Sequence, residues 1–378
     1  MSGLKILVPW YAYPPHSRER VGGLSVSLWE ITHGLKRRGL EVEILVPGKG
    51  EDEFESVDGI RVIRSALGRD VLDGRVISPP QVKKLVETYD WVISFNNYGS
   101  GALFASRTAV EKVVRYIHTV AIDRPISSYV SLESGLFEYG RMFVLRRREI
   151  RAEKRLKDAR TLCVSGFLEE RMIHFRLTER NLTRVIPNGV DTENFRPSPT
   201  EKVQDILFVG RFQKVKGLDI LLSSLKHLFL SELRKYKVGV VGPFSPDQRA
   251  VLMRNVPEEL REMIEFYGTV PHEDMPHFFN SSRLVVVPSR YETFGLPALE
   301  GIACGVPVVA SNVGGLPEIV NAEVGLLFEA GDSAALAKAI SKGMSEEVAD
   351  AAMKNGPTMA KRFDWRVVCD QLAGALST

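Results

Sequence analysis

The chain has 378 residues, of which 44% are hydrophobic and 26% charged, and its formal net charge is +3. These values are typical of an ordinary soluble globular protein, and the length exceeds that of a typical single core, which predicts two domains. No run approaches the roughly 18 apolar residues that a membrane-spanning helix needs, so any membrane contact is expected to be peripheral.

The three cysteines, Cys163, Cys304 and Cys369, are far apart and lack CxxC spacing. This spacing argues against a disulfide framework or a zinc site and is typical of a reducing, cytoplasmic compartment. The first residues, MSGLKILVPW, run into a strand-like segment without a signal-peptide pattern. We therefore expect a cytoplasmic protein.

Short apolar runs alternate with helical patterns through the first half of the chain. Short buried strands that alternate with helices indicate parallel sheets covered on both faces. Residues 49–90 show little beyond this general pattern. The predicted strands lie at 4–8, 42–46, 60–63, 91–95, 113–118, 162–165 and 184–187, and the predicted helices include 24–38 and 141–159.

A proline-rich polar segment at 195–199 predicts a linker, after which a second series of strands begins. The sequence thus predicts an α/β protein with two doubly wound parallel-sheet domains, residues 1–198 and 199–362, followed by a terminal helix at about 363–378. The predicted strands of the second series lie at 205–209, 237–241, 264–267, 284–288 and 306–310.

In open parallel sheets, ligands bind at the carboxyl ends of the strands, in the turns that follow. The first predicted strand is followed by a long loop that ends in Gly22 and Gly23. Paired glycines allow the close backbone approach that a phosphate-facing turn requires, although an ordinary tight turn is an alternative. The GxGxxG fingerprint of dinucleotide-binding enzymes is absent, which disfavours a dehydrogenase.

The first strand of the second series ends in the loop GRFQKVKG at 210–217, with Arg211 and Lys216 on its two sides. A planar guanidinium and a compact ammonium together suit a diphosphate. A solvated basic loop would have the same composition.

The segment RYETFGLPALEGIACG at 290–305 places Glu292 in a loop and Glu300 eight residues further on. Between them, GLP at 295–297 predicts the start of a helix, where backbone N–H groups and the helix dipole suit an anion. Glu300, expected in the first helical turn, would accept hydrogen bonds from sugar or ribose hydroxyls. The segment indicates a ligand with both phosphate and hydroxyls, such as a nucleotide sugar; a merely charged helix start is the alternative.

A further glycine pair, Gly314 and Gly315, is predicted to open a helix after the next strand. Each of these loops has a plain structural explanation on its own. Their recurrence at four strand ends, in order and over both halves of the chain, favours a binding site.

Together these segments resemble the family 4 retaining glycosyltransferases, whose GT-B fold consists of two Rossmann-like domains facing across a cleft. The resemblance covers nearly the whole chain, and its motifs are specific as a set rather than singly. The matching segments are the Gly22-Gly23 loop, His118 in RYIHT, VSGF at 164–167, IPNGVD at 186–191, VGRFQKVKG at 209–217, PSRYETFGLPALEGIACGVPVVAS at 288–311 and GGLPE at 314–318.

The resemblance implies a role for individual residues. It assigns Arg211 and Lys216 to the donor diphosphate, Glu292 to the hydroxyls of the donor sugar and Glu300 to the ribose. His118 would line the reacting side of the sugar, although a histidine hydrogen-bonded at a strand end is the structural alternative. The backbone groups that the resemblance places at the donor are those of Gly22, Gly23, Gly210, Phe294, Gly295 and Leu296.

The resemblance also implies the reaction: a hexose moves from a UDP-, GDP- or ADP-sugar, with retention, to a saccharide or lipid-linked acceptor in glycan biosynthesis. Negative charge builds on the departing phosphate, and fixed cations stabilise that state more than the ground state. No DxD motif or His/Asp/Glu group with ligand spacing stands at a convincing strand end. We therefore expect Arg211 and Lys216 to replace a metal, and we expect no cofactor.

The acceptor is expected to bind among three loops of the first domain, at 9–21, 96–98 and 119–140. No residue pattern in these loops names the acceptor. The polar candidates in them are His16, Arg18, Asn97, Tyr98 and Arg124.

Residues 1–198 carry 31 Lys and Arg against 25 Asp and Glu, a net charge of +6, which suggests an anionic partner; ordinary surface composition is the alternative. The basic helix predicted at 141–160 has two interpretations, a solvated helix and a peripheral contact with the cytoplasmic face of a membrane. Nucleic acid is not expected as a partner, because aromatic residues are not interleaved with the basic ones.

Two other functions remain open at this stage. A nucleotide-sugar epimerase of the same fold would need no acceptor, and a catalytically silent module would bind the sugar nucleotide only. Against the silent module, all of the matching site residues are present, whereas degenerate copies tend to lose some. By resemblance the last helix packs back on the first domain, and a cleft would close about the two crossings of the chain.

Overall fold

The computed structural model describes residues 3–10, 23–48, 53–65, 87–95, 111–120, 123, 146–147, 150–151, 153–154, 156–254 and 256–377. The chain forms two compact units. Unit 1 contains the described residues up to Asn188 together with those that follow Asp364, and unit 2 contains Gly189–Asp364. Among the described residues, the first change of unit, from Asn188 to Gly189, thus precedes the segment 195–199 that was predicted as a linker.

Unit 1 is built on an eight-stranded sheet with the order β3-β4-β2-β1-β5-β6-β7-β8. Every strand pair in it is parallel except β3 with β4. The strands are β1 Lys5–Pro9, β2 Glu41–Pro47, β3 Glu53–Val57, β4 Ile60–Ser65, β5 Trp91–Phe95, β6 Val113–Ile117, β7 Arg160–Cys163 and β8 Thr183–Val185.

The parallel strands are buried on both faces, as their unbroken apolar runs predict. In β1, the consecutive residues Ile6, Leu7 and Val8 are all 0% exposed, although neighbours along a strand point to opposite faces. Three helices of this unit are α1 Gly23–Arg37, α6 Gly166–His174 and α15 Trp365–Leu376.

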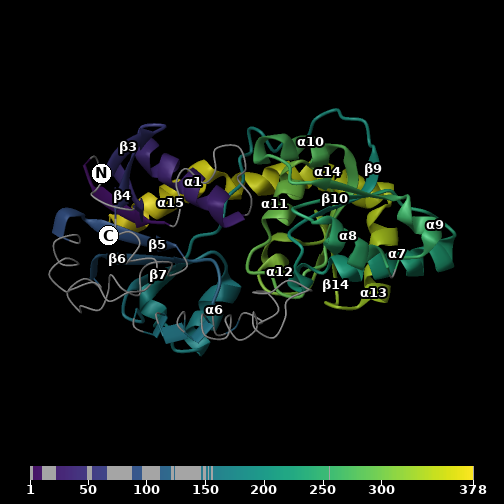
Figure 1. Ribbon diagram of the computed structural model, residues 1–378, viewed down its shortest axis with the longest axis horizontal. Coiled ribbons are helices and arrows are strands. Elements are labelled where there is room, and N and C mark those ends of the chain that lie inside the picture. The colour runs from purple at the N-terminus through teal and green to yellow at the C-terminus, as the bar shows by residue number, and fades with distance from the viewer. Residues whose placement is uncertain are drawn as a thin grey trace. The chain divides into compact units, whose positions relative to one another are not determined.

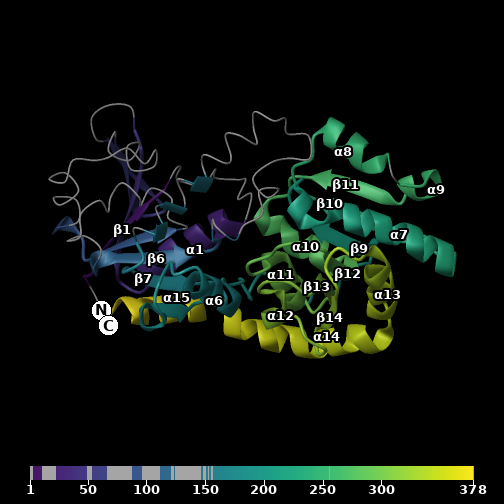
Figure 2. The same ribbon diagram turned by 90° about the horizontal axis from the view of Figure 1, so that it is seen from below.

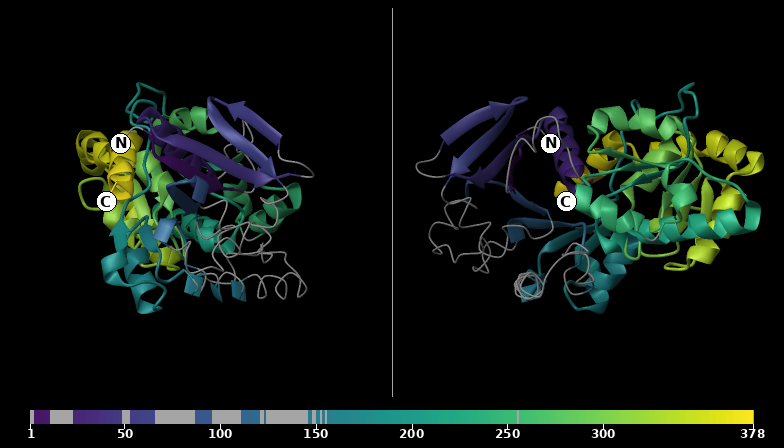
Figure 3. Two further views of the ribbon diagram at one scale, coloured as in Figure 1. Left: turned by 90° about the vertical axis from the view of Figure 1, so that its left-hand side faces the viewer. Right: turned by 45° about the vertical axis from the view of Figure 1, so that its right-hand side comes forward.

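Strand β3 was not predicted from the sequence. Its residues EFESV are mostly exposed, so it lacks the apolar run that marks the other strands. Asp58 and Gly59, with φ values of 49° and 74°, form the turn to β4. Two residues with positive φ in an Asp-Gly sequence are the signal of a tight β-hairpin. The pair stands at the edge of the sheet, in purple-blue in Figure 3.

The last helix, α15, packs against α1, and the two lie side by side at the yellow and purple ends of the chain in Figure 1. A Cβ at Gly34 would lie 2.2 Å from the Cys369 sulfur, so only glycine allows this close approach. Arg38 Nε donates to Asp370 at 2.7 Å beside the same contact. Residues 365–376 therefore form part of the core of unit 1.

Unit 2 is built on a six-stranded parallel sheet with the order β11-β10-β9-β12-β13-β14. Its last strand, β14, was not predicted. The strands are β9 Gln204–Val209, β10 Val238–Val241, β11 Ile264–Gly268, β12 Ser282–Val287, β13 Val308–Ser311 and β14 Gly325–Phe328. The helices are α7 Leu218–Glu232, α8 Pro246–Met253, α9 Glu258–Arg261, α10 Met275–Asn280, α11 Leu296–Ala303, α12 Leu316–Ile319, α13 Ser333–Gly343 and α14 Glu346–Ala360.

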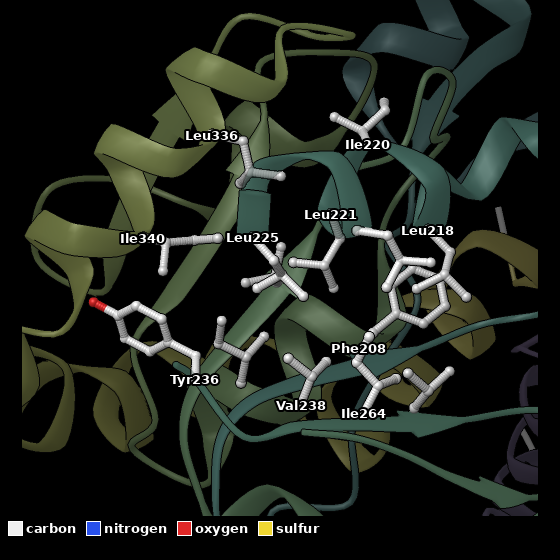
Figure 4. Packing of buried hydrophobic residues seen from close by; sticks show 14 of the residues in the cluster. Phe208, Leu218, Ile220, Leu221, Leu225, Tyr236, Val238, Ile264, Leu336 and Ile340 are labelled. Atoms are coloured by element: carbon white, nitrogen blue, oxygen red, sulfur yellow. The ribbon is translucent and has the colours of Figure 1, made fainter. Parts of the chain in front are cut away.

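Helices cover both faces of this sheet. On one face α7 packs against α13, and their residues Leu221, Leu225 and Leu336 belong to one cluster with alternate strand residues (Figure 4). On the other face α11 packs against α14, and the small Gly301 lies against Val285. Figure 2 shows α7 lying along β9 and β10. Each fully buried leucine stabilises the fold by about 1.5–3 kcal/mol.

The two points at which the described residues pass between the units, after Asn188 and after Asp364, lie side by side. Val190 pairs in parallel with Asp364, and its backbone N–H donates to the Phe363 carbonyl at 2.8 Å. The Thr192 hydroxyl donates to the Asp364 carboxylate. The predicted fold class, two doubly wound parallel sheets, is confirmed in both units.

Candidate functional site

The predicted donor residues of unit 2 come from two neighbouring strands. Strands β9 and β12 pair in parallel, so the loops that follow their carboxyl ends begin at the same edge of the sheet. Gly217, with φ of 72°, ends the first loop, and a Cβ there would lie 1.8 Å from the Pro288 carbonyl oxygen. Glycine at this position therefore lets the two loops touch.

Lys216 and Glu292 meet between these loops. The Lys216 Nζ lies 2.7 Å from Glu292 Oε2, and their side chains are 26% and 11% exposed. The Ser289 hydroxyl donates weakly to the same oxygen at 3.4 Å, and the Thr293 N–H donates to Oε1 at 3.2 Å. The carboxylate is thus held by groups of its own loop and by the lysine of the neighbouring loop.

Arg211 follows Gly210 directly at the end of β9, and its side chain is exposed. The 3₁₀-helix η4, Lys214–Lys216, then carries the chain from Arg211 to Lys216. Both predicted cations thus stand on the loop that follows β9.

Arg290 and Asp219, which sequence reasoning did not single out, fasten the same two loops. The guanidinium of Arg290 donates through Nη1 and Nη2 to the two carboxylate oxygens of Asp219, each at 2.7 Å. Its Nη1 also donates to the Lys214 carbonyl at 2.7 Å, and its backbone N–H donates to Val215. A bidentate pair of this kind fixes orientation as well as distance. In the sequence, Arg290 was visible as the arginine of RYE in the motif, two positions before Glu292.

Helix α11 begins directly beside the ion pair. Its N-cap is Gly295, in the left-handed region with φ of 102°, and Pro297 is the second helical residue. The side chains of Phe294 and Leu296 are buried, at 3% and 8% exposure, so this turn can reach a ligand only through its backbone. No residue in the described part of unit 2 accepts a hydrogen bond from the N–H groups of Gly295 and Leu296. These N–H groups suit an anion.

The expected place of Glu300 in the first helical turn was wrong. Helix α11 begins at Leu296, which makes Glu300 its fifth residue. The carboxylate is 7% exposed, and its Oε1 lies 2.9 Å from His272 Nε2. His272 belongs to the 3₁₀-helix η5, His272–Asp274, which follows β11, and its ring contacts Phe195. Sequence reasoning missed His272, because nothing in the local pattern joins it to a residue 28 positions away.

The glycine pair at 314–315 packs against the backbone of the Glu292 loop. Gly314 has φ of 58°, and a Cβ on it would lie 1.7 Å from the Glu292 carbonyl oxygen. The Gly315 N–H donates to that same oxygen at 3.1 Å. The pair therefore fixes the position of the Glu292 loop.

In unit 1, His118 directly follows β6 and is 6% exposed. Burial lowers the pKa of its imidazole to about 4, so the ring is neutral at pH 7. Gly23 is the first residue of α1. The other candidates of this unit, Gly22, His16, Arg18, Asn97, Tyr98 and Arg124, lie outside the described residues, as do 9 of the 20 residues of the predicted helix 141–160.

Both halves of the chain match known protein families. Residues 21–194 match the family described as Glycosyltransferase Family 4, and residues 190–358 match the family described as Glycosyl transferases group 1. The chain belongs to glycosyltransferase family 4. As a member, it transfers a sugar from a nucleotide sugar and is a retaining hexosyltransferase.

Two relatives of this glycosyltransferase are similar over most of its length. An uncharacterised glycosyltransferase of Methanocaldococcus jannaschii is 28% identical over 85% of this chain and 84% of its own. A D-inositol 3-phosphate glycosyltransferase of Acidothermus cellulolyticus is 27% identical over 93% of this chain and 85% of its own.

Solved structures show the same fold over the whole chain. A sucrose-phosphate synthase of Thermosynechococcus elongatus superposes with a TM-score of 0.77 at 21% identity, covering 99% of this chain and 98% of its own. Anabaena HepE in complex with UDP-glucose superposes with a TM-score of 0.71 at 22% identity, covering 99% and 100%. The predicted GT-B fold is therefore confirmed for this glycosyltransferase.

A pocket of about 420 Å³ opens elsewhere in unit 2 of the glycosyltransferase, beside α8 and the end of β11. Phe244, Met253 and Phe266 give it an apolar lining, and the Arg249 guanidinium lies over the Phe266 ring. None of the predicted site residues lines it. The candidate site is therefore defined by the charged groups at the ends of β9 and β12 and not by this pocket.

In the described ranges of the glycosyltransferase, no three His, Cys, Asp or Glu side chains are grouped so that they could hold a metal ion. None of the described helices is both long and apolar enough to cross a membrane.

Proposed function

We propose that this glycosyltransferase moves a hexose from a nucleotide-diphosphate sugar to a saccharide or lipid-linked acceptor, with fixed cations in place of a metal. The observation that carries this proposal is the meeting of Lys216 and Glu292 at the start of α11. A cation, a carboxylate and helix N–H groups in one place match a ligand with both phosphates and hydroxyls.

In the proposed reaction, negative charge grows on the leaving diphosphate while the sugar carbon becomes cationic. Lys216, Arg211 and the N–H groups at the start of α11 would stabilise the phosphate charge more strongly in the transition state than in the ground state. The proton of the acceptor hydroxyl would pass to the departing phosphate, on the face from which it leaves. This route accounts for retention without a protein nucleophile.

Glu292 and Glu300 would accept hydrogen bonds from the hydroxyls of the donor. Glu292 stands beside the cations and would accept from hydroxyls of the hexose. Glu300 is buried five residues into α11 and would accept from the ribose through the oxygen that His272 does not bind. The two carboxylates thus give the site its sugar selectivity, while the cations bind the diphosphate.

The test begins with thermal unfolding in the presence of UDP, GDP, ADP and their common sugar conjugates. A ligand that binds only the folded state raises the Tm by an amount set by its concentration over its Kd. We expect one nucleotide series to shift the Tm, and we expect Lys216→Ala to remove most of that shift. No shift from any series in wild type would contradict the proposed donor site.

Transfer is then measured as nucleotide release, with D-inositol 3-phosphate, simple saccharides and lipid-linked saccharides as acceptors. The first acceptor comes from the name of a relative that is 27% identical. We expect nucleotide release to depend on the acceptor and to continue in the presence of EDTA. We expect the product to keep the anomeric configuration of the donor. Release that stops with EDTA would overturn metal independence, and interconversion of the sugar without acceptor would indicate an epimerase.

A further inference from the structure

Four residues distant in the sequence form a buried polar cluster in unit 1. Gly23 and Ser27 lie in the first turns of α1, His118 directly follows β6, and Asn188 follows β8. Ser27, His118 and Asn188 are 0%, 6% and 5% exposed. Strands β6 and β8 run parallel to the same neighbour, β7, so His118 and Asn188 come from the same edge of the sheet.

The distances join the cluster into one chain of hydrogen bonds. His118 Nδ1 lies 3.3 Å from the Tyr116 carbonyl oxygen, and His118 Nε2 lies 3.0 Å from Asn188 Oδ1. The same amide atom of Asn188 lies 2.9 Å from Ser27 Oγ, which in turn lies 2.8 Å from the Gly23 carbonyl oxygen.

Counting protons gives one consistent assignment of this chain. A neutral imidazole carries one N–H and a serine one O–H, whereas the carbonyls of Tyr116 and Gly23 can only accept. For both carbonyls to receive a proton, the imidazole proton is on Nδ1 and donates to Tyr116, and the Ser27 hydroxyl donates to Gly23. His118 Nε2 and Ser27 Oγ are then both acceptors that face one atom of Asn188.

Only the amide NH₂ of Asn188 can serve both acceptors, because it has two protons to donate. The structure places the amide oxygen at this point, but the oxygen and nitrogen of an asparagine amide are assigned from the hydrogen bonds around them. Turning the amide by 180° puts the nitrogen there, which these bonds favour. With the oxygen in that place, one hydroxyl proton would have to serve both Gly23 and Asn188. The imidazole would then either face the Tyr116 carbonyl with a lone pair or be charged, and burial opposes the charged form.

We propose that Asn188 is a positioning residue that donates to both His118 and Ser27 and so holds His118 neutral, with its proton on Nδ1. The proposal rests on the proposed function in one respect, the placement of His118 beside the donor sugar. It extends that function by giving a role to the asparagine of the IPNGVD motif.

The surroundings keep Asn188 in place for this task. The Tyr116 hydroxyl lies 3.0 Å from the carbonyl oxygens of both Ile186 and Pro187, the two residues before Asn188. Tyr116 is fully buried, and burial raises the pKa of its hydroxyl well above the usual value, so it stays a donor. The His118 ring is stacked on Phe95 with centroids 5.7 Å apart, which fixes the ring plane.

The consequence for the reaction is that His118 does not act as a general base. Its Nδ1 carries a proton bound to Tyr116, and its Nε2 lone pair is bound by Asn188. Taking a proton from an acceptor hydroxyl would break one of these bonds. The ring instead offers a fixed, uncharged surface. Through its hydrogen bond to Ser27, Asn188 also connects the ring to the first turn of α1, which begins at Gly23.

The protonation pattern is tested on the full-length protein with ¹⁵N-labelled histidine. Two-bond proton–nitrogen spectra at pH 7 distinguish a protonated from an unprotonated ring nitrogen, and the signals that disappear in His118→Gln identify His118. We expect Nδ1 protonated and Nε2 unprotonated in wild type. A proton on Nε2, or on both nitrogens, would overturn the proposal whatever the enzyme transfers.

Asn188→Asp tests the positioning role, because a carboxylate can only accept. We expect the His118 proton to move to Nε2 or the ring to become charged near pH 7. We also expect kcat to fall at least tenfold for release of nucleotide from the donor that wild type consumes among UDP-glucose, GDP-mannose and ADP-glucose. The KM for that donor is expected to change less than threefold, and the pH profile should gain an ionisation. Asn181→Asp, an exposed change of the same kind in the same unit, is the matched control.

The two proposals fail in distinguishable ways. Loss of turnover in Asn188→Asp with unchanged His118 signals would contradict positioning through His118. Normal turnover in Asn188→Asp with altered signals would contradict the role of His118 beside the donor. Wild type that turns over none of the three sugar nucleotides would count against the proposed function, while the wild-type spectrum still decides the assignment of the proton.

Discussion

The Lys216 ammonium lies 2.7 Å from the Glu292 carboxylate, so the cation proposed to bind the diphosphate is paired with the carboxylate proposed to bind the sugar. Both groups are partly or largely withdrawn from water, which strengthens their interaction compared with an exposed pair. A diphosphate that binds to Lys216 must share it with Glu292 or displace Glu292. The pair therefore couples occupation of the phosphate site to the position of the carboxylate.

This coupling predicts opposite effects of two substitutions on the binding of a nucleoside diphosphate without sugar. Lys216→Ala should weaken the Kd about 10- to 100-fold, because a charge-assisted contact of roughly 1.5–3 kcal/mol is lost. Glu292→Gln removes a competing negative charge and should leave the Kd unchanged or tighten it by about threefold. Both should reduce transfer by about 100-fold or more. Titration calorimetry with UDP, GDP and ADP, next to a transfer assay, separates the two effects; weaker binding in both variants would contradict the coupling.

His272 should control selection of the ribose. His272→Ala leaves the buried Glu300 carboxylate without its imidazole partner, which lies 2.9 Å away in wild type. We expect wild type to bind the ribonucleoside diphosphate about tenfold or more tightly than its 2′-deoxy or 3′-deoxy analogue, as for a hydrogen bond to a charged group. In His272→Ala this preference should shrink to about threefold or less. His272→Gln retains a donor and should restore part of it; an undiminished preference in the alanine variant would refute the role of His272.

Gly314→Ala should both destabilise the protein and abolish transfer. The left-handed backbone costs an alanine about 1–2 kcal/mol, and the Cβ would lie 1.7 Å from the Glu292 carbonyl oxygen, so the Glu292 loop must move. We expect a total loss above about 3 kcal/mol in urea unfolding. Gly331→Ala is the control, since its φ is 86° and nothing lies within 4 Å of its added Cβ. Equal losses in the two variants would show that the close contact adds nothing.

His118 should make stability depend on pH in a defined window. Its pKa is lowered from 6.5 to about 4 in the folded state, mainly by burial, so between these values the unfolded chain binds a proton that the folded chain does not. Stability is therefore fully present above pH 6.5 and is lost as pH falls towards 4, by about 3 kcal/mol at most. Urea unfolding of wild type and His118→Gln between pH 7 and pH 4 measures this contribution. A slope against pH that is the same in both proteins would contradict it.

The sequence predicts the fold well where burial leaves an apolar run. Strands such as β5, which is buried after its first residue, were placed correctly, and the loops at their carboxyl ends follow from the rule for parallel sheets. Strand β3 was missed because most of its side chains face water, although Asp58-Gly59 carried a hairpin signal. The start of α11 was predicted at the correct glycine, but the depth of Glu300 in the helix was not.

Contacts between distant residues were beyond sequence reasoning. The pairs Lys216–Glu292 and His272–Glu300 span 76 and 28 positions, and only the sheet order brings them together. The same holds for Asn188, which the IPNGVD motif marked without a role. A motif names the residue types that the chemistry needs, whereas their partners depend on which strands become neighbours.

The packing of α15 on α1 also has a consequence for how the protein folds while it is synthesised on the ribosome. The described residues of unit 2 lie within Gly189–Asp364, and their core can form once that stretch has emerged. The core of unit 1 includes Cys369, Leu372 and Leu376, all at most 2% exposed, which are made after Gly189–Asp364. Domains otherwise tend to fold from the N-terminus as they emerge. In this chain the core of unit 1 cannot be completed until the whole of Gly189–Asp364 has been made, so it is unit 1 that will need protection from aggregation during synthesis.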